Sequence, residues 1–172
     1  KEKNLDSEQT VLSLSYGKIV VRDVEKNYGL LPASFDSYQR IRPGNVILRL
    51  TDLQNDKKSL RVGISEHDGI ITPVYLSLRG LRGLRNEFLF YYLYESDTRK
   101  VLYSLGSGLR QTLRFEELGK MKVLTPPLHE QEQIVEYLDR KTTLIDSLIE
   151  KTVRKIELLK EKRTSLINEV VT

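Results

Sequence analysis

Residues 126–172 read PPLHEQEQIVEYLDRKTTLIDSLIEKTVRKIELLKEKRTSLINEVVT. After Pro127 this stretch contains neither proline nor glycine, the two residues that most disfavour a helix interior. The two prolines end the segment before them, and Glu130 and Glu132 lie in the first turns, where carboxylates complement the helix dipole. We therefore expect one uninterrupted helix over residues 128–172.

Along this helix an apolar side chain recurs every seven positions, which is typical of a coiled-coil seam. Thr152 and Arg163 interrupt the stripe, so the predicted pairing is imperfect. About 40 helical residues span roughly 60 Å, farther than a domain of this size can cover, so the helix needs a partner. The expected dimerisation residues are Leu138, Ile145, Leu148, Ile149, Ile156, Leu159, Leu166 and Val170.

Residues 1–127 have a different character, with short β-branched or aromatic segments separated by Gly, Pro, Asn and Asp. Turn signals occur at 42–45 and 66–69, where proline presets φ and glycine accepts positive φ. The predicted fold class is α+β, a strand-rich mixed globular domain over 1–127 followed by one long coiled-coil-forming helix over 128–172. The expected elements are strands at 11–15, 17–21, 46–50, 70–78 and 120–124, a mostly buried helix at 86–96 and a turn or helix at 113–118.

The composition argues against several kinds of chemistry. The chain has no cysteine, which excludes disulfides and thiolate zinc sites, and its two histidines, His67 and His129, are far apart in sequence. Neither a phosphate-binding glycine motif nor a nucleophile elbow is present. We therefore expect that this chain is not an enzyme and has no catalytic residue, cofactor or metal. No apolar run approaches membrane-spanning length and no signal peptide opens the chain. We therefore expect a cytoplasmic protein that does not bind or cross a membrane.

The net charge of +4 resides in the front part of the chain. Residues 128–172 carry 8 Lys and Arg against 9 Asp and Glu, which leaves 20 against 15 for residues 1–127. A basic surface suits a polyanionic partner. Arg79, Arg82 and Arg85 stand three apart with no acid among them, and guanidinium groups clamp phosphates or pair with guanine. The alternative is that these arginines pair with carboxylates elsewhere in the chain.

Two further segments are candidate DNA contacts. The glycines of the 106–111 segment let backbone amides approach a phosphate, Ser107 and Arg110 can donate to it, and Gln111 could read adenine. The alternative is a plain glycine turn with a solvated arginine. A weaker group lies around the first strands, where the tyrosine could equally belong to the core; it consists of Tyr16, Lys18 and Arg22.

A family resemblance is carried by the start of the expected helix and by positions along it. These are the run Pro126-Pro127-Leu128-His129-Glu130-Gln131, followed by Ile134, Leu138-Asp139, Ile145-Asp146, Leu148-Ile149, Ile156, Leu159, residues 161–163 and Leu166-Ile167. With looser motifs at 43–49, 51–53, 69–75 and 106–111, it resembles the specificity subunit of type I restriction-modification systems. Asn45 departs from the acidic residue usual in the family's turn but preserves the turn chemistry.

The resemblance implies one target recognition domain that reads half of a split DNA site and one conserved spacer helix, which makes half a specificity subunit. Such a chain would be a non-catalytic, sequence-specific reader of double-stranded DNA. The implied partners are modification subunits, which bind S-adenosylmethionine and methylate adenine, a restriction subunit, and a second copy paired through the helix. The alternative is a coiled-coil scaffold whose front domain binds protein, which an apolar patch in place of a basic face would favour.

Overall fold

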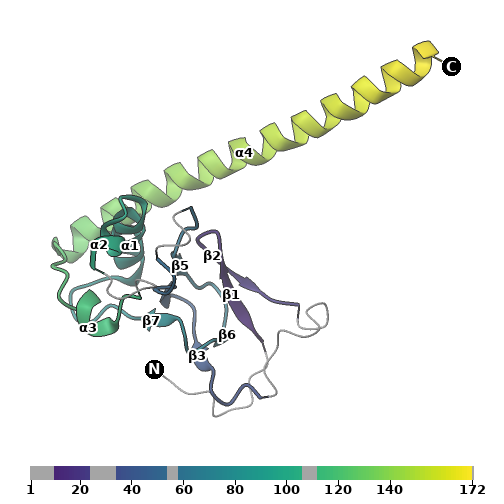
Figure 1. Ribbon diagram of the computed structural model, residues 1–172. Coiled ribbons are helices and arrows are strands. Elements are labelled where there is room, and N and C mark those ends of the chain that lie inside the picture. The colour runs from purple at the N-terminus through teal and green to yellow at the C-terminus, as the bar shows by residue number, and fades with distance from the viewer. Residues whose placement is uncertain (1–9, 24–33, 54–57, 106–111, 172) are drawn as a thin grey trace. The chain divides into compact units, whose positions relative to one another are not determined.

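The computed structural model describes residues 10–23, 34–53, 58–105 and 112–171 (Figure 1). Its contacts divide it into two compact units, Lys1–Glu132 and Gln133–Thr172. Among the described residues, the first unit holds all the strands, three helices and the first turn of a fourth, and the second unit holds the rest of that fourth helix. The α+β class predicted from the sequence is confirmed.

The strands form three small antiparallel sheets. β1 (Leu12–Ser15) and β2 (Lys18–Val21) make a hairpin, and β3 (Gln39–Ile41) pairs with β6 (Gly69–Ile71). In the third sheet β4 (Val46–Leu48) lies between β5 (Val62–Ile64) and β7 (Leu76–Leu78). An isolated bridge between Val11 and Ile70 connects the hairpin with β6.

β4 stands at the centre of the first unit because both of its faces are covered. Val46 and Leu48 join a core cluster that includes Val62 of β5, whereas Ile47 between them joins a second cluster with Leu12 and Ile71. Alternation of side chains along a strand sends neighbours to opposite faces, which explains this division. All three residues of β4 are fully buried.

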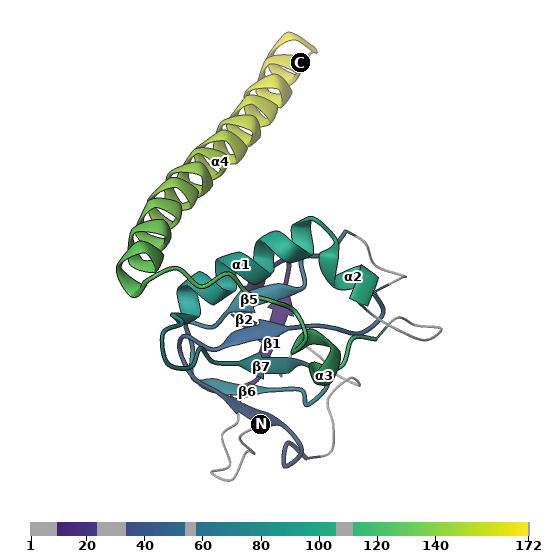
Figure 2. The same ribbon diagram turned by 90° about the vertical axis from the view of Figure 1, so that its left-hand side faces the viewer.

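Four helices are described in the chain. α1 (Asn86–Thr98) packs against β5 and β4 (Figure 2), and it is followed by α2 (Val101–Leu105) and α3 (Phe115–Leu118). α1 matches the predicted helix and buries Phe88, Leu89 and Leu93. α4 (Leu128–Val171) begins at the predicted residue and continues without a break for 44 residues.

The single strand expected at 70–78 is wrong, because β6 ends at Ile71 and β7 begins at Leu76. The chain turns between them, and the amide of Tyr75 donates to the carbonyl of Thr72 at 3.2 Å. Pro73 within this turn has no amide hydrogen to offer a sheet. The buried side chain of Gln39 donates to the carbonyls of Thr72 and Tyr75 at 3.0 and 2.7 Å, so the chain can change sheets here.

The strand expected at 120–124 is also wrong, since this segment forms no sheet ladder. Its Met121 side chain packs against the α1 side of the core, and the Tyr92 hydroxyl donates to the carbonyl of Lys122 at 3.0 Å. A side chain of α1 therefore takes the place of a neighbouring strand. Three short elements were not predicted, namely β3, β5 and α2.

No helix among the described residues is long and apolar enough to span a membrane.

Candidate nucleic-acid interface

The segment that joins β7 to α1, residues 79–85, is called here the arginine loop. Its centre is a tight turn in which the amide of Leu84 donates to the carbonyl of Leu81 at 2.9 Å. Gly83 has a φ of +82°, a backbone conformation that glycine adopts without steric cost. At the tip Leu81 is 84% exposed. The turn thus holds its outward-facing side chains on a defined backbone.

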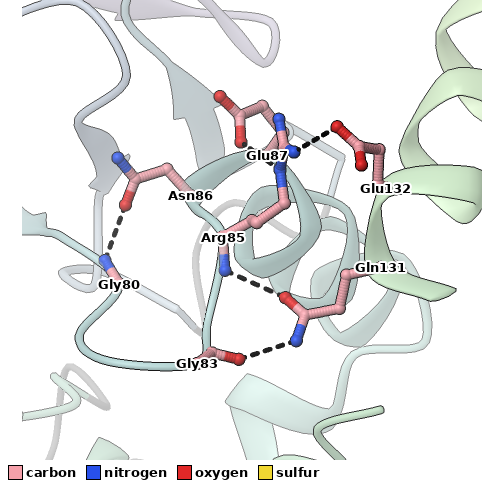
Figure 3. A network of polar contacts seen from close by, with 7 residues as sticks. All are labelled: Gly80, Gly83, Arg85, Asn86, Glu87, Gln131 and Glu132. Atoms are coloured by element: carbon pink, nitrogen blue, oxygen red, sulfur yellow. Dashed lines mark hydrogen bonds and ion pairs between the residues drawn. The ribbon is translucent and has the colours of Figure 1, made fainter. Parts of the chain in front are cut away.

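Gly80 is fixed from two sides. Its amide donates to Oδ1 of Asn86 at 2.6 Å (Figure 3), and a Cβ at this position would lie 2.1 Å from the carbonyl oxygen of Leu84. The backbone therefore passes too close for any side chain.

Gly80→Ala is expected to lower the free energy of unfolding by about 1–3 kcal/mol, because the loop must open to admit the methyl group. Gly83→Ala is the matched control, since no atom lies within 4 Å of its Cβ and only the left-handed φ opposes it, at about 1–2 kcal/mol. Urea denaturation measures both free energies. A Gly80 variant as stable as wild type would contradict the close approach.

A buried glutamine at the start of α4 fastens the other end of the arginine loop (Figure 3). The side-chain amide of Gln131 donates to the carbonyls of Gly83 at 2.7 Å and Pro126 at 2.8 Å, and its oxygen accepts the amide of Arg85 at 2.9 Å. Gln131 is fully buried, so these bonds replace those it would otherwise make with water.

The three arginines of the loop differ in their surroundings. The guanidinium of Arg85 pairs with Glu132 at 2.8 Å and with Glu87 at 3.5 Å. These interactions, of which the hydrogen bond to Glu132 has the largest effect, raise the pKa of Arg85 above its usual value. Arg79 and Arg82 are exposed, and no carboxylate within the described ranges forms an ion pair with either. Within the part of the chain that the structure describes, the internal pairing considered as an alternative applies to Arg85 and not to Arg79 or Arg82.

The third group of candidate residues, Tyr16, Lys18 and Arg22, is divided between the two ends of the β1–β2 hairpin. Its turn consists of Tyr16 and Gly17, with φ values of 47° and 79°, as expected for a two-residue hairpin loop. Tyr16 is 83% exposed at this tip, beside the exposed Lys18, so it does not belong to the core. Arg22 lies at the opposite end of the hairpin, where its amide donates to Val11. The structure brings Tyr16 and Lys18 together and leaves Arg22 apart.

Comparison with known families identifies much of this region. A family model described as the type I restriction modification DNA specificity domain matches residues 75–158. The matched range contains the arginine loop, α1 and more than half of α4. Residues 75–158 of this chain are therefore similar to a type I restriction modification DNA specificity domain.

Solved structures resemble this chain at low sequence identity. One chain, from a structure described as the basis of complex assembly and conformational transition of the type I R-M system, is 22% identical, with a TM-score of 0.51 over 63% of this chain and 25% of its own. The HsdS subunit from Thermoanaerobacter tengcongensis is 22% identical, with a TM-score of 0.46 over 63% of this chain and 24% of its own. The first likeness supports the fold. The present chain spans about a quarter of the length of either solved chain. A search of curated proteins found no significant match.

The remaining candidate residues, Ser107, Arg110 and Gln111, lie outside the described residues. The histidines do not form a site: His67 belongs to an exposed turn, and His129 is exposed in the first turn of α4. Among the residues that the structure describes, no group of three or more acidic or histidine side chains is placed to hold a metal ion.

Gln131 is the residue of this region that sequence reasoning missed. The signal was present, because Gln131 ends the Pro-Pro-x-x-Glu-Gln run on which the resemblance to specificity subunits rests. A glutamine in the first turn of a helix is ordinarily solvated, and its partners on the arginine loop stand 46 and 48 residues earlier in the chain. Only the fold brings them together.

The second unit presents the predicted seam as an exposed stripe on α4. From Ile145 onward the seam side chains are about half exposed or more. Thr142 and Thr152 fall in line with them, and their hydroxyls donate to the carbonyls of Leu138 and Leu148 at 2.9 and 2.7 Å. These threonines therefore satisfy their own polar groups and can be covered by a partner helix at little cost.

Proposed function

We propose that this chain is a non-catalytic subunit that recognises a specific double-stranded DNA sequence for a type I restriction-modification complex, with residues 1–127 reading one half-site. The observation that carries the proposal is the specificity-domain match across the arginine loop, where Arg79 and Arg82 are exposed on a fastened turn. The cofactor for methyl transfer would reside in the modification subunit, and this chain would supply only the recognition of the DNA sequence.

In this proposal Arg79 and Arg82 contact the DNA directly. A guanidinium binds a phosphate by charge or a guanine edge by two parallel hydrogen bonds. Arg85 belongs to the same interface, with its guanidinium held by Glu132 and Glu87. Tyr16 and Lys18 at the hairpin tip, Arg22, and the 106–111 segment with Ser107, Arg110 and Gln111 complete the proposed DNA-binding set.

A salt titration tests the arginine contacts. Each phosphate contact contributes about −0.9 to the slope of log affinity against log salt, so Arg79→Ala and Arg82→Ala should each make the slope shallower by about 0.9. Arg99→Ala is the matched control, because Arg99 is an exposed arginine of the same unit that pairs with Glu95. Fluorescence anisotropy with a labelled duplex measures the slopes. Equal slopes for wild type and both loop variants would exclude phosphate contacts by these residues, and equal slopes with unchanged affinity would remove them from the interface.

The proposed partner of α4 is the α4 helix of a second copy. The seam supplies an apolar stripe of heptad spacing, and residues 128–172 are nearly neutral overall, so two copies repel each other little. A dimer formed in this way would carry two recognition domains and read a symmetric site. The modification and restriction subunits would then assemble around the paired helices.

A further inference from the structure

The arginine loop has no backbone–backbone sheet ladder of its own to hold it in place. Among the described residues, its fixed points are one short turn, the bond from Gly80 to Asn86, the bonds to Gln131, and the ion pairs of Arg85 with Glu132 and Glu87. The bond at Gly80 and the bond from Gln131 to the carbonyl of Gly83 lie on either side of Leu81 and Arg82. The backbone position of Arg82, next to Gly83, therefore depends on the side chain of Gln131.

A carboxamide can make all three of these bonds, and among side chains of this length only glutamine carries one. The carbonyls of Gly83 and Pro126 require two N–H donors, and the amide of Arg85 requires an acceptor on the same group. Glutamate has no donor for the two carbonyls, and methionine, with a similar volume, has neither a strong donor nor a strong acceptor. The ion pair between Arg85 and Glu132 lies directly beside this network (Figure 3).

We propose that Gln131 is a positioning residue that sets the sequence preference of the chain by holding the arginine loop in its DNA-reading geometry. This inference rests on the proposed function. A fixed loop places guanidinium groups on base edges without an ordering cost at the moment of binding. A loosened loop still attracts phosphates, so non-specific affinity should persist while the preference for one sequence declines.

The test compares Gln131→Met with Gln133→Met in the complex of the chain with its modification subunit. Gln133 lies two residues farther along α4, is exposed, and makes no contact used in this proposal. The probes are the duplex that the wild-type complex enriches most from a randomised library, and a random duplex of equal length. Hydrogen exchange at the amide of Arg85, measured on each chain by NMR, reports the loop geometry independently of DNA.

For Gln131→Met we expect the ratio of specific to random affinity to decline about tenfold, the size of one lost bidentate base contact. Affinity for the random duplex should change little, and the amide of Arg85 should exchange faster while the amides of β4 remain protected. Gln133→Met should match wild type. If Gln131→Met does not fold, Gln131→Glu replaces it, because it keeps the acceptor for Arg85 and removes only the donors.

The inference is overturned if the Gln131 variant keeps the wild-type ratio, if the Arg85 amide stays protected, or if Gln133→Met loses as much preference. A wild-type complex with no sequence preference overturns the proposed function, and the inference with it. The two failures are distinguished by the wild-type ratio alone.

Discussion

Arg61→Met is expected to lower the free energy of unfolding by about 3–5 kcal/mol, because each buried acceptor that loses its donor costs about 1–3 kcal/mol. The side chain of Arg61 is fully buried, which is rare for arginine. Its guanidinium donates to the carbonyls of Thr51 at 2.7 Å and Asp52 at 2.9 Å, and to the Tyr103 hydroxyl at 3.0 Å. Methionine fills a similar space but supplies none of these donors.

Arg99→Met is the matched control for this loss. Arg99 is 76% exposed and pairs with Glu95 one helical turn earlier, so its removal should cost no more than about 0.5 kcal/mol. Urea denaturation followed by circular dichroism gives both free energies of unfolding. Similar values for the two variants would show that the buried guanidinium does not hold the 49–53 segment against β5.

Leu159→Asp is expected to weaken self-association of the chain at least a hundredfold. In a two-fold dimer each seam substitution occurs twice, and every leucine removed from an apolar contact costs about 1.5–3 kcal/mol. Two such losses amount to about 3 kcal/mol or more, which corresponds to a factor above about one hundred. The introduced carboxylates would also have to be buried or would force the helices apart.

Leu158→Asp is the matched control, because it introduces the same carboxylate into α4 and so reports any general effect on helix formation or solubility of the chain. Leu158 is adjacent on α4 and as exposed as Leu159, at 55% against 56%, but it does not lie on the seam. Sedimentation equilibrium of both variants and of wild type measures the association. If wild type is a monomer at every concentration, or if both variants associate as wild type does, the proposed seam does not pair two copies.

The features that sequence reasoning predicted are those governed by local patterns. α4 follows from 45 residues without proline or glycine, and the turn at 42–45 follows from its residue types. In that turn Gly44 has a φ of +83°, and Oδ1 of Asn45 accepts the amide of Arg42 at 2.7 Å. The side chain of Asn45 thus closes the turn, as its residue type predicts.

The features that it missed depend on contacts between distant segments. β5 contains Gly63, which disfavours a strand by itself, but this strand packs closely against the hairpin, where a Cβ on Gly63 would lie 2.7 Å from the Leu14 side chain and 3.0 Å from the carbonyl oxygen of Gly17. The segment at 120–124 has residue types that favour a strand, but no neighbouring strand pairs with it. Its Lys122 carbonyl instead accepts a hydrogen bond from the hydroxyl of Tyr92 in α1. The pairing of Arg85 with Glu132 spans 47 residues, and no spacing rule predicts it.

Enrichment of duplexes from a randomised double-stranded library tests the central claim most directly. The purified chain, with its modification subunit, is incubated with the library at fixed salt, and the retained DNA is sequenced. We expect one motif to dominate, repeated in inverted orientation if two copies pair through α4. Retention without any enriched motif, together with undiminished self-association, would contradict sequence-specific reading and identify the chain as a scaffold.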